Sequence, residues 1–119
     1  MARTALAAFA GGDPVVVPSG SCAAMVRHGY PELFAGQPEE EAALAMAART
    51  RELTQFLSEH GLDAGARGSG SATYHDSCHM LRELKIAEPP RRLLEATGAN
   101  LVPLPRPDLC CGFGGTFSV

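Results

Sequence analysis

Short hydrophobic runs alternate with longer amphipathic stretches along the chain. Residues 13–18 (DPVVVP) contain a run of three β-branched valines between two prolines, and a pair of glycines precedes the segment. This pattern is typical of a buried strand in a parallel sheet. Similar short runs predict strands at 72–76 and 100–104.

The stretches between these strands have helical spacing. We expect helices at 23–34, at 38–60, at 80–86 and from Pro89 to a stop at Gly98. The segment 63–71 (DAGARGSGS) is rich in Gly and Ser and is predicted to be a loop. Strands that alternate with helices favour an α/β fold with a parallel sheet and flanking helices.

The four cysteines follow the predicted strands. Cys22 and Cys78 each lie in a polar turn between a strand and a helix, and Cys110 and Cys111 lie in the loop after the third strand. Because the carboxyl ends of parallel strands meet at one edge of a sheet, we expect these cysteines to gather there. A position near a helix N-terminus also favours the thiolate that metals bind.

Composition narrows the class of protein without fixing its function. The chain has 119 residues, 45% of them hydrophobic, and a formal net charge of −3. This balance argues against a broad basic surface for nucleic acid. No apolar run approaches the roughly 20 residues of a membrane span. We therefore expect a cytoplasmic protein, in which cysteines more often serve metal or redox chemistry than structural disulfides.

The adjacent pair Cys110-Cys111 suits a multinuclear metal site better than a single zinc ion, because neighbouring side chains diverge and can hold different metal atoms. Gly112 and Gly114 would let the backbone approach such a site closely. An unliganded buried pair and a vicinal disulfide remain alternatives. The Gly-rich segment matches neither common phosphate-binding motif.

Two histidines flank Cys78. His75 and His79 could donate hydrogen bonds to a cluster sulfur or tune its potential, and this role is favoured over direct ligation. Asp76 is a candidate N-cap for the helix that follows.

Three segments in order, PSGSCAAM, TYHDSCHMLREL and LCCGFGGTFSV, resemble the cysteine-rich CCG-domain iron–sulfur proteins. The resemblance covers roughly residues 14 to 119, and 31 residues separate Cys78 from Cys110. It implies a Rossmann-like fold. It also implies that Cys22, Cys78, Cys110 and Cys111 are ligands of a 4Fe–4S cluster, which is noncubane in some relatives.

In that family, two tandem halves each carry a cysteine, a CCG motif and a closing cysteine. By resemblance, Cys22 closes the first half, and Cys78 with the Cys110-Cys111 pair opens the second. We therefore expect the end of a first CCG half at 1–61, a linker at 62–71 and the start of a second half at 72–119. The remaining motifs are absent, so the chain is expected to be an incomplete part of a longer protein.

The resemblance implies an electron-transfer subunit of an iron–sulfur complex that oxidises L-lactate to pyruvate. Other lactate-utilization or redox subunits would be its partners, and no residue of this chain would act as a general acid or base. A non-enzymatic metal-binding or scaffold module is the alternative, with zinc held by Cys78, Cys110 and Cys111 and with His79 as a candidate fourth ligand. A third reading is a fragment that folds poorly and has no activity.

Overall fold

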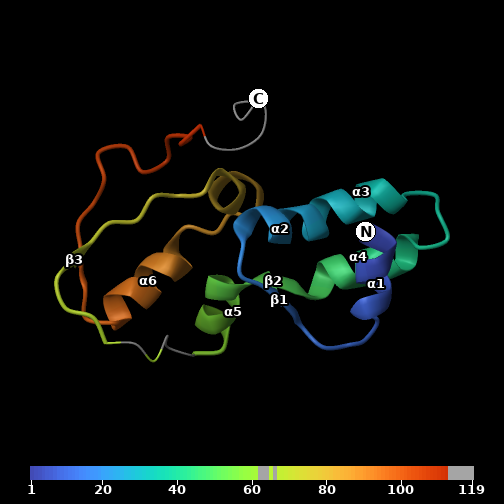
Figure 1. Cartoon of the computed structure of the whole chain (residues 1–119), viewed down its shortest axis with the longest axis horizontal. Coiled ribbons are helices and arrows are strands. Elements are labelled where there is room, and N and C mark those ends of the chain that lie inside the picture. The colour runs from blue at the N-terminus through green and yellow to red at the C-terminus, as the bar shows by residue number, and fades with distance from the viewer. Residues whose placement is uncertain (62–64, 66, 113–119) are drawn as a thin grey trace.

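Two short parallel sheets organise the chain. The computed structural model describes residues 1–61, 65 and 67–112. Strand β1 (Val15–Val17) pairs with β2 (Thr50–Glu52), and β3 (Ser71–Ala72) pairs with β4 (Asn100–Leu101). Helices lie in each crossover between the paired strands (Figure 1). The predicted α/β class with parallel pairing and flanking helices is confirmed, as a small and incomplete arrangement.

The first sheet is surrounded by most of the helices. In chain order these are α1 (Ala2–Ala8), α2 (Gly20–Ala24), the π-helical η1 (Met25–Gly29), α3 (Tyr30–Phe34), α4 (Glu40–Arg49) and α5 (Leu53–Glu59). The segment α2, η1 and α3 is one continuous helix, as predicted for 23–34, but it begins at Gly20, so Cys22 lies in the first turn of the helix and not in the turn before it. Its π turn precedes Pro31, which has no N–H to donate to the carbonyl of Arg27.

The single helix predicted at 38–60 is wrong, because β2 interrupts it. Thr50 is completely buried and its Oγ1 donates to the carbonyl of Met46, 2.7 Å away, at the end of α4. Glu52 is extended and its carboxylate accepts the backbone N–H groups of Thr54 and Gln55, which starts α5. Pairing with β1 outweighs the local helix preference of these residues.

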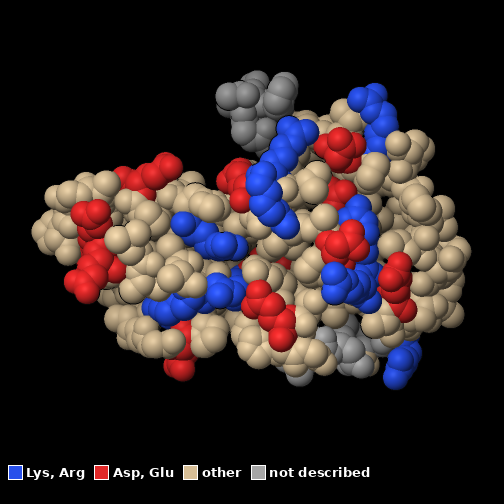
Figure 2. Space-filling model, turned by 180° about the vertical axis from the view of Figure 1, so that it is seen from behind, with Lys and Arg blue, Asp and Glu red and all other residues tan. Residues whose placement is uncertain are grey.

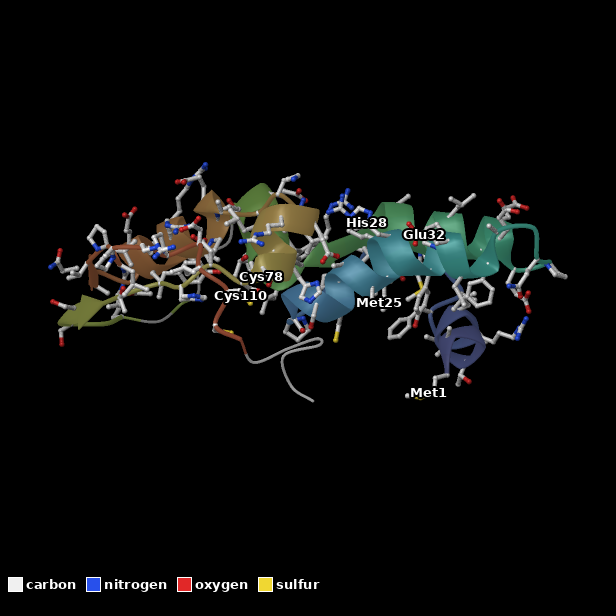
Figure 3. All side chains as sticks on the ribbon, turned by 90° about the horizontal axis from the view of Figure 1, so that it is seen from above. Met1, Met25, His28, Glu32, Cys78 and Cys110 are labelled. Carbon is white, nitrogen blue, oxygen red and sulfur yellow. The ribbon has the colours of Figure 1, made fainter. Side chains whose placement is uncertain are left out.

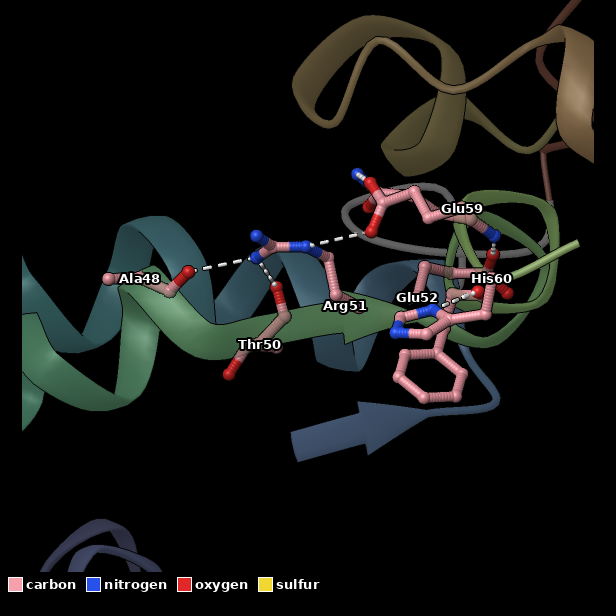
Figure 4. A network of polar contacts seen from close by, with 8 residues as sticks. Ala48, Thr50, Arg51, Glu52, Glu59 and His60 are labelled. Atoms are coloured by element: carbon pink, nitrogen blue, oxygen red, sulfur yellow. Dashed lines mark hydrogen bonds and ion pairs between the residues drawn. The ribbon is translucent and has the colours of Figure 1, made fainter. Parts of the chain in front are cut away.

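A polar network fixes the outer side of this break (Figure 4). Arg51 lies 3.2 Å from Glu59 of α5 and donates to the carbonyls of Ala48 and Thr50 at 2.8 and 3.0 Å. Nδ1 of His60 lies 2.8 Å from the carbonyl of Phe56. The arginine thus ties the end of α4 to α5 across the strand.

The second sheet is shorter than predicted. Of the strand predicted at 72–76, residues 73–76 are not in β3. The strand predicted at 100–104 ends at Leu101, before Pro103, which cannot donate to a ladder. The helix predicted at 80–86 is the π-helix η2 (His79–Glu83). It ends two residues before Lys85, which has a positive φ of 59°. Helix α6 (Glu88–Ala96) ends before Gly98 as predicted.

Two buried clusters make the core. The first contains Leu6, Val15, Phe34, Ala43 and Met46, and the second contains Ala23, Ala24, Met80, Leu84 and Ile86. Val17 packs against both clusters, so the strand β1 joins them.

Helix α2 lies directly against η2, near the middle of the molecule (Figure 1). A Cβ atom on Gly20 would come within 2.3 Å of Cγ of Met80. The close approach of the two helices therefore depends on a residue without a side chain. It places the helix that carries Cys22 beside the helix that follows Cys78.

The surface carries both signs of charge. Figure 2 shows Lys and Arg side chains interspersed with Asp and Glu over the face drawn there. Among the helices of the described residues, none is long and apolar enough to cross a membrane.

Candidate functional site

The candidate site lies where the loop after β4 meets the turn before η2. Cys78 is the residue immediately before η2, and Cys110 and Cys111 end the described part of the loop with Gly112. Cys78 and Cys110 lie close enough for each thiol to shift the pKa of the other. Figure 3 shows these two residues side by side, between η2 and the loop. Two of the four cysteines that were predicted to gather therefore lie near each other.

The sulfur of Cys110 also accepts a hydrogen bond from the backbone. The N–H of Gly112 lies 3.4 Å from this sulfur, and Gly112 has a φ of 75°. That conformation is in the left-handed region, where a side chain is strained. The glycine that was predicted to shape a cluster loop thus points its N–H at a cysteine sulfur.

The electrostatic surroundings separate the two thiols. The hydrogen bond with Cys110, followed by burial, raises the pKa of the Cys78 thiol. The N–H of Gly112, followed by the hydrogen bond with Cys78, lowers the pKa of the Cys110 thiol. The positive charge of Arg82 lowers the pKa of both. Cys110 is therefore the first of the pair to become a thiolate, with Cys78 as its hydrogen-bond donor.

Cys111 contributes to the same environment, because its charge raises the pKa of Cys78. Cys22 lies on the exposed side of α2, the helix packed against η2. Across 1–61, 65 and 67–112, no group of three or more His, Cys, Asp or Glu side chains is arranged to hold a metal ion. The structure therefore places the thiols of Cys78 and Cys110 near each other, and Cys111 follows Cys110 directly in the sequence. Among the described residues, no bond joins Cys22 to these three.

The flanking histidines have other partners. Nε2 of His75 lies 2.7 Å from the carbonyl of Leu109. Nδ1 of His79 lies 2.6 Å from the carboxylate of Glu83, one turn along η2. The predicted site residue Gly114 lies outside the described residues.

The sequence analysis did not predict the polar contacts that three charged residues, Asp76, Arg82 and Arg91, make around the site. Asp76 is buried and does not cap η2; its two carboxylate oxygens accept hydrogen bonds from Arg91 of α6 at 2.8 and 2.7 Å. Arg91 also lies over the ring of Tyr74, 5.1 Å from its centroid. Arg82 reaches the carbonyl of Asp108. The N-cap prediction for Asp76 is wrong, because a guanidinium fifteen residues away offers two charged donors.

The donor set suits a thiophilic metal. Thiolates are the protein ligands of iron–sulfur clusters and of many zinc sites. The N–H of Gly112 and the charge of Arg82 stabilise negative charge on these sulfurs. Cys78, Cys110 and Cys111 are the residues that would hold such a group here.

Comparison with known proteins agrees with these motifs. Residues 72–119 match the model of the cysteine-rich domain family, CCG. The lactate utilization protein A of Geobacillus kaustophilus is 58% identical over 116 residues, which are 94% of this chain and 48% of that protein. Those of Geobacillus thermodenitrificans and Shouchella clausii are 59% and 52% identical, over 94% and 99% of this chain and 48% and 51% of their own lengths.

The chain thus spans about half the length of the curated relatives that it matches. No solved structure matches it. The predicted resemblance is confirmed: residues 72–119 carry the cysteine-rich CCG domain match, in a chain similar over nearly all its length to lactate utilization A proteins.

Proposed function

We propose that this chain is part of an iron–sulfur electron-transfer subunit, with Cys78, Cys110 and Cys111 as cluster ligands. The proximity of Cys110 to Cys78, with the N–H of Gly112 directed at the Cys110 sulfur 3.4 Å away, is the observation that carries the proposal. These two cysteines are separated by 31 residues of sequence. The relatives named for lactate utilization support a role in that process.

The parent reaction would be the oxidation of L-lactate to pyruvate, which releases two electrons and two protons. A 4Fe–4S cluster would supply one-electron transfer between a partner subunit's substrate site and the next acceptor. The residues of this chain would hold the cluster and stabilise its charge. Gly112 and Arg82 would do so at the sulfurs, Gly114 would shape the same loop, and His79 would tune the potential from η2.

The same proposal covers the organisation of the chain. Residues 1–61 would be the end of a first CCG half, 62–71 a linker and 72–119 the start of a second half. Cys22, carried by the first half, would serve a separate site as its closing ligand. Other redox subunits would be the partners, and four free cysteines suit a reducing cytoplasm.

Anaerobic reconstitution with iron and sulfide tests the proposal. The wild-type chain should take up iron and acid-labile sulfide and give a cluster signal in electron paramagnetic resonance. The signal should be lost in Cys110→Ser and retained in the matched control Cys22→Ser, whose thiol lies on α2. Uptake of zinc without sulfide would favour the scaffold module instead, and a signal unaffected by Cys110→Ser would contradict the ligand assignment.

A further inference from the structure

Three successive backbone carbonyls directly before Cys110 accept hydrogen bonds from the segment around Cys78. The carbonyl of Pro107 accepts from the N–H of Asp76 at 2.9 Å, that of Asp108 from Nη2 of Arg82 at 3.4 Å, and that of Leu109 from Nε2 of His75 at 2.7 Å. The donors surround Cys78 on both sides in sequence. We call these three bonds the carbonyl clamp.

We propose that His75 and Arg82 are positioning residues that clamp the loop at Pro107–Leu109 and so hold Cys110 and Cys111 beside Cys78 before a metal binds. This inference rests on the proposed function, because the site that it positions is the proposed cluster site. It adds a role for two side chains that contact backbone and need not touch the metal.

The clamp fixes the path of the chain rather than a side chain. Because all three acceptors are main-chain carbonyls, the contact orients the backbone immediately before the two cysteines. Part of the conformational entropy cost of gathering the ligands is then met during folding, which favours binding of a metal to the preorganised loop.

The donor side of the clamp is itself held in place. The carboxylate of Asp76 is bound through both oxygens by Arg91 of α6, and Arg91 also donates to the carbonyl of Ala87 at 2.6 Å. The N–H of Asp76 is therefore presented to Pro107 by a residue anchored to a helix. His75 directly precedes Asp76, so the same ion pair restrains its backbone.

The geometry also separates His75 from His79. With Nε2 on the carbonyl of Leu109, His75 acts as a donor to the loop. The ring of His79 is paired with Glu83 within η2, whereas the ring of His75 contacts the loop. His79 is consequently a matched control for His75, since both rings lie within three residues of Cys78.

Amide hydrogen exchange of the metal-free chain tests the clamp directly, because the N–H of Asp76 is one of its three bonds. His75→Phe should speed exchange of the Asp76 amide about fivefold, the change expected when one ordinary hydrogen bond is lost. His75→Gln, which keeps a donor, should restore most of the protection, and His79→Phe should leave it unchanged. Equal protection in wild type and His75→Phe would overturn the proposal.

Cobalt(II) titration supplies a second readout through its thiolate charge-transfer absorption. The affinity of His75→Phe should be about fivefold weaker than that of wild type, for the same reason. Should His75→Phe unfold, as fast exchange throughout α4 would reveal, Arg82→Met at an exposed position serves instead. Unchanged cobalt affinity and Asp76 exchange in that variant would overturn the role of Arg82.

Failure of the two proposals can be told apart. A wild-type chain that takes up no iron or sulfide would contradict the cluster assignment, while accelerated Asp76 exchange in His75→Phe would still establish the clamp. Iron uptake by wild type with unchanged exchange in the variant would retain the cluster and remove the clamp.

Discussion

Asp76 and Arg91 form a bidentate ion pair that joins the turn before Cys78 to helix α6. The two bonds are 2.8 and 2.7 Å long, and the side chains are 6% and 23% exposed. Arg91 stacks over Tyr74 on the same side. The pair therefore connects the second sheet's crossover helix to the residues that carry the candidate ligands.

Removal of one partner should destabilise the fold. We expect Asp76→Ala to lower the free energy of unfolding by about 2 kcal/mol, since Arg91 would be left partly buried without its carboxylate. Arg92→Met, an exposed neighbour on α6, should change it by less than about 0.5 kcal/mol. Urea denaturation of the metal-free variants measures both values, and equal effects would show that the ion pair has no special weight.

Gly20 controls the distance between α2 and η2. Gly20→Ala should lower the free energy of unfolding by about 1–3 kcal/mol, because the new Cβ would overlap the buried side chain of Met80. The matched change Gly29→Ala meets the exposed and movable side chain of Met25. It should stabilise the helix by about 0.5–1 kcal/mol. Thermal unfolding of the two variants should shift in opposite directions.

If Gly20→Ala proved neutral, the packing of α2 on η2 would have to be looser than the structure shows. A second variant checks this cause. In the double variant Gly20→Ala/Met80→Ala, the shorter side chain at position 80 should remove the steric overlap. The loss of unfolding free energy should therefore be smaller than the sum of the losses in the two single variants.

Glu52 should be worth more to stability than its exposed counterpart Glu59. Its carboxylate accepts two backbone N–H groups at the start of α5. Glu52→Ala should therefore cost about 1 kcal/mol of unfolding free energy, the usual value of an N-cap. Glu59→Ala removes a surface partner of Arg51 and of Gln55 and should cost about 0.5 kcal/mol or less. Chemical denaturation separates the two, and a larger loss for Glu59 would contradict the capping role.

The two thiols in contact should react at different pH values. The pKa of Cys110 is lowered by the N–H of Gly112 and by Cys78, whereas that of Cys78 is raised by its bond to Cys110. The thiolate of Cys110 consequently appears at the lower pH. In the metal-free chain, alkylation by iodoacetamide, followed by peptide mass spectrometry, should therefore reach its midpoint at lower pH for Cys110 than for Cys78.

Arg82→Met gives the control for this profile. The charge of Arg82 lowers the pKa of both thiols, so both midpoints should move to higher pH in the variant. A reversed order of the two cysteines in the wild-type chain would contradict the assigned hydrogen-bond direction.

Local sequence signals failed where a distant partner decided the conformation. Thr50 to Glu52 follow ten helical residues and precede seven more, so a single helix was the natural prediction. Only β1, more than thirty residues earlier, supplies the strand that pairs with them. Asp76 shows the same limit, because its N-cap pattern is local and its real partner is Arg91.

The sequence by itself determined the α/β class, the order of strand, turn and helix around Cys22 and Cys78, and the similarity to cysteine-rich CCG proteins. These depend on periodicity, on Gly and Pro positions and on motif spacing, which are local properties of the chain.

Only the tertiary structure decided that the thiols of Cys78 and Cys110 lie close together, and that His75 and Arg82 bind the loop before Cys110. The acceptors of these bonds are backbone carbonyls, which every residue carries. Sequence letters therefore cannot mark them, and their partners become visible only when packing brings distant segments together.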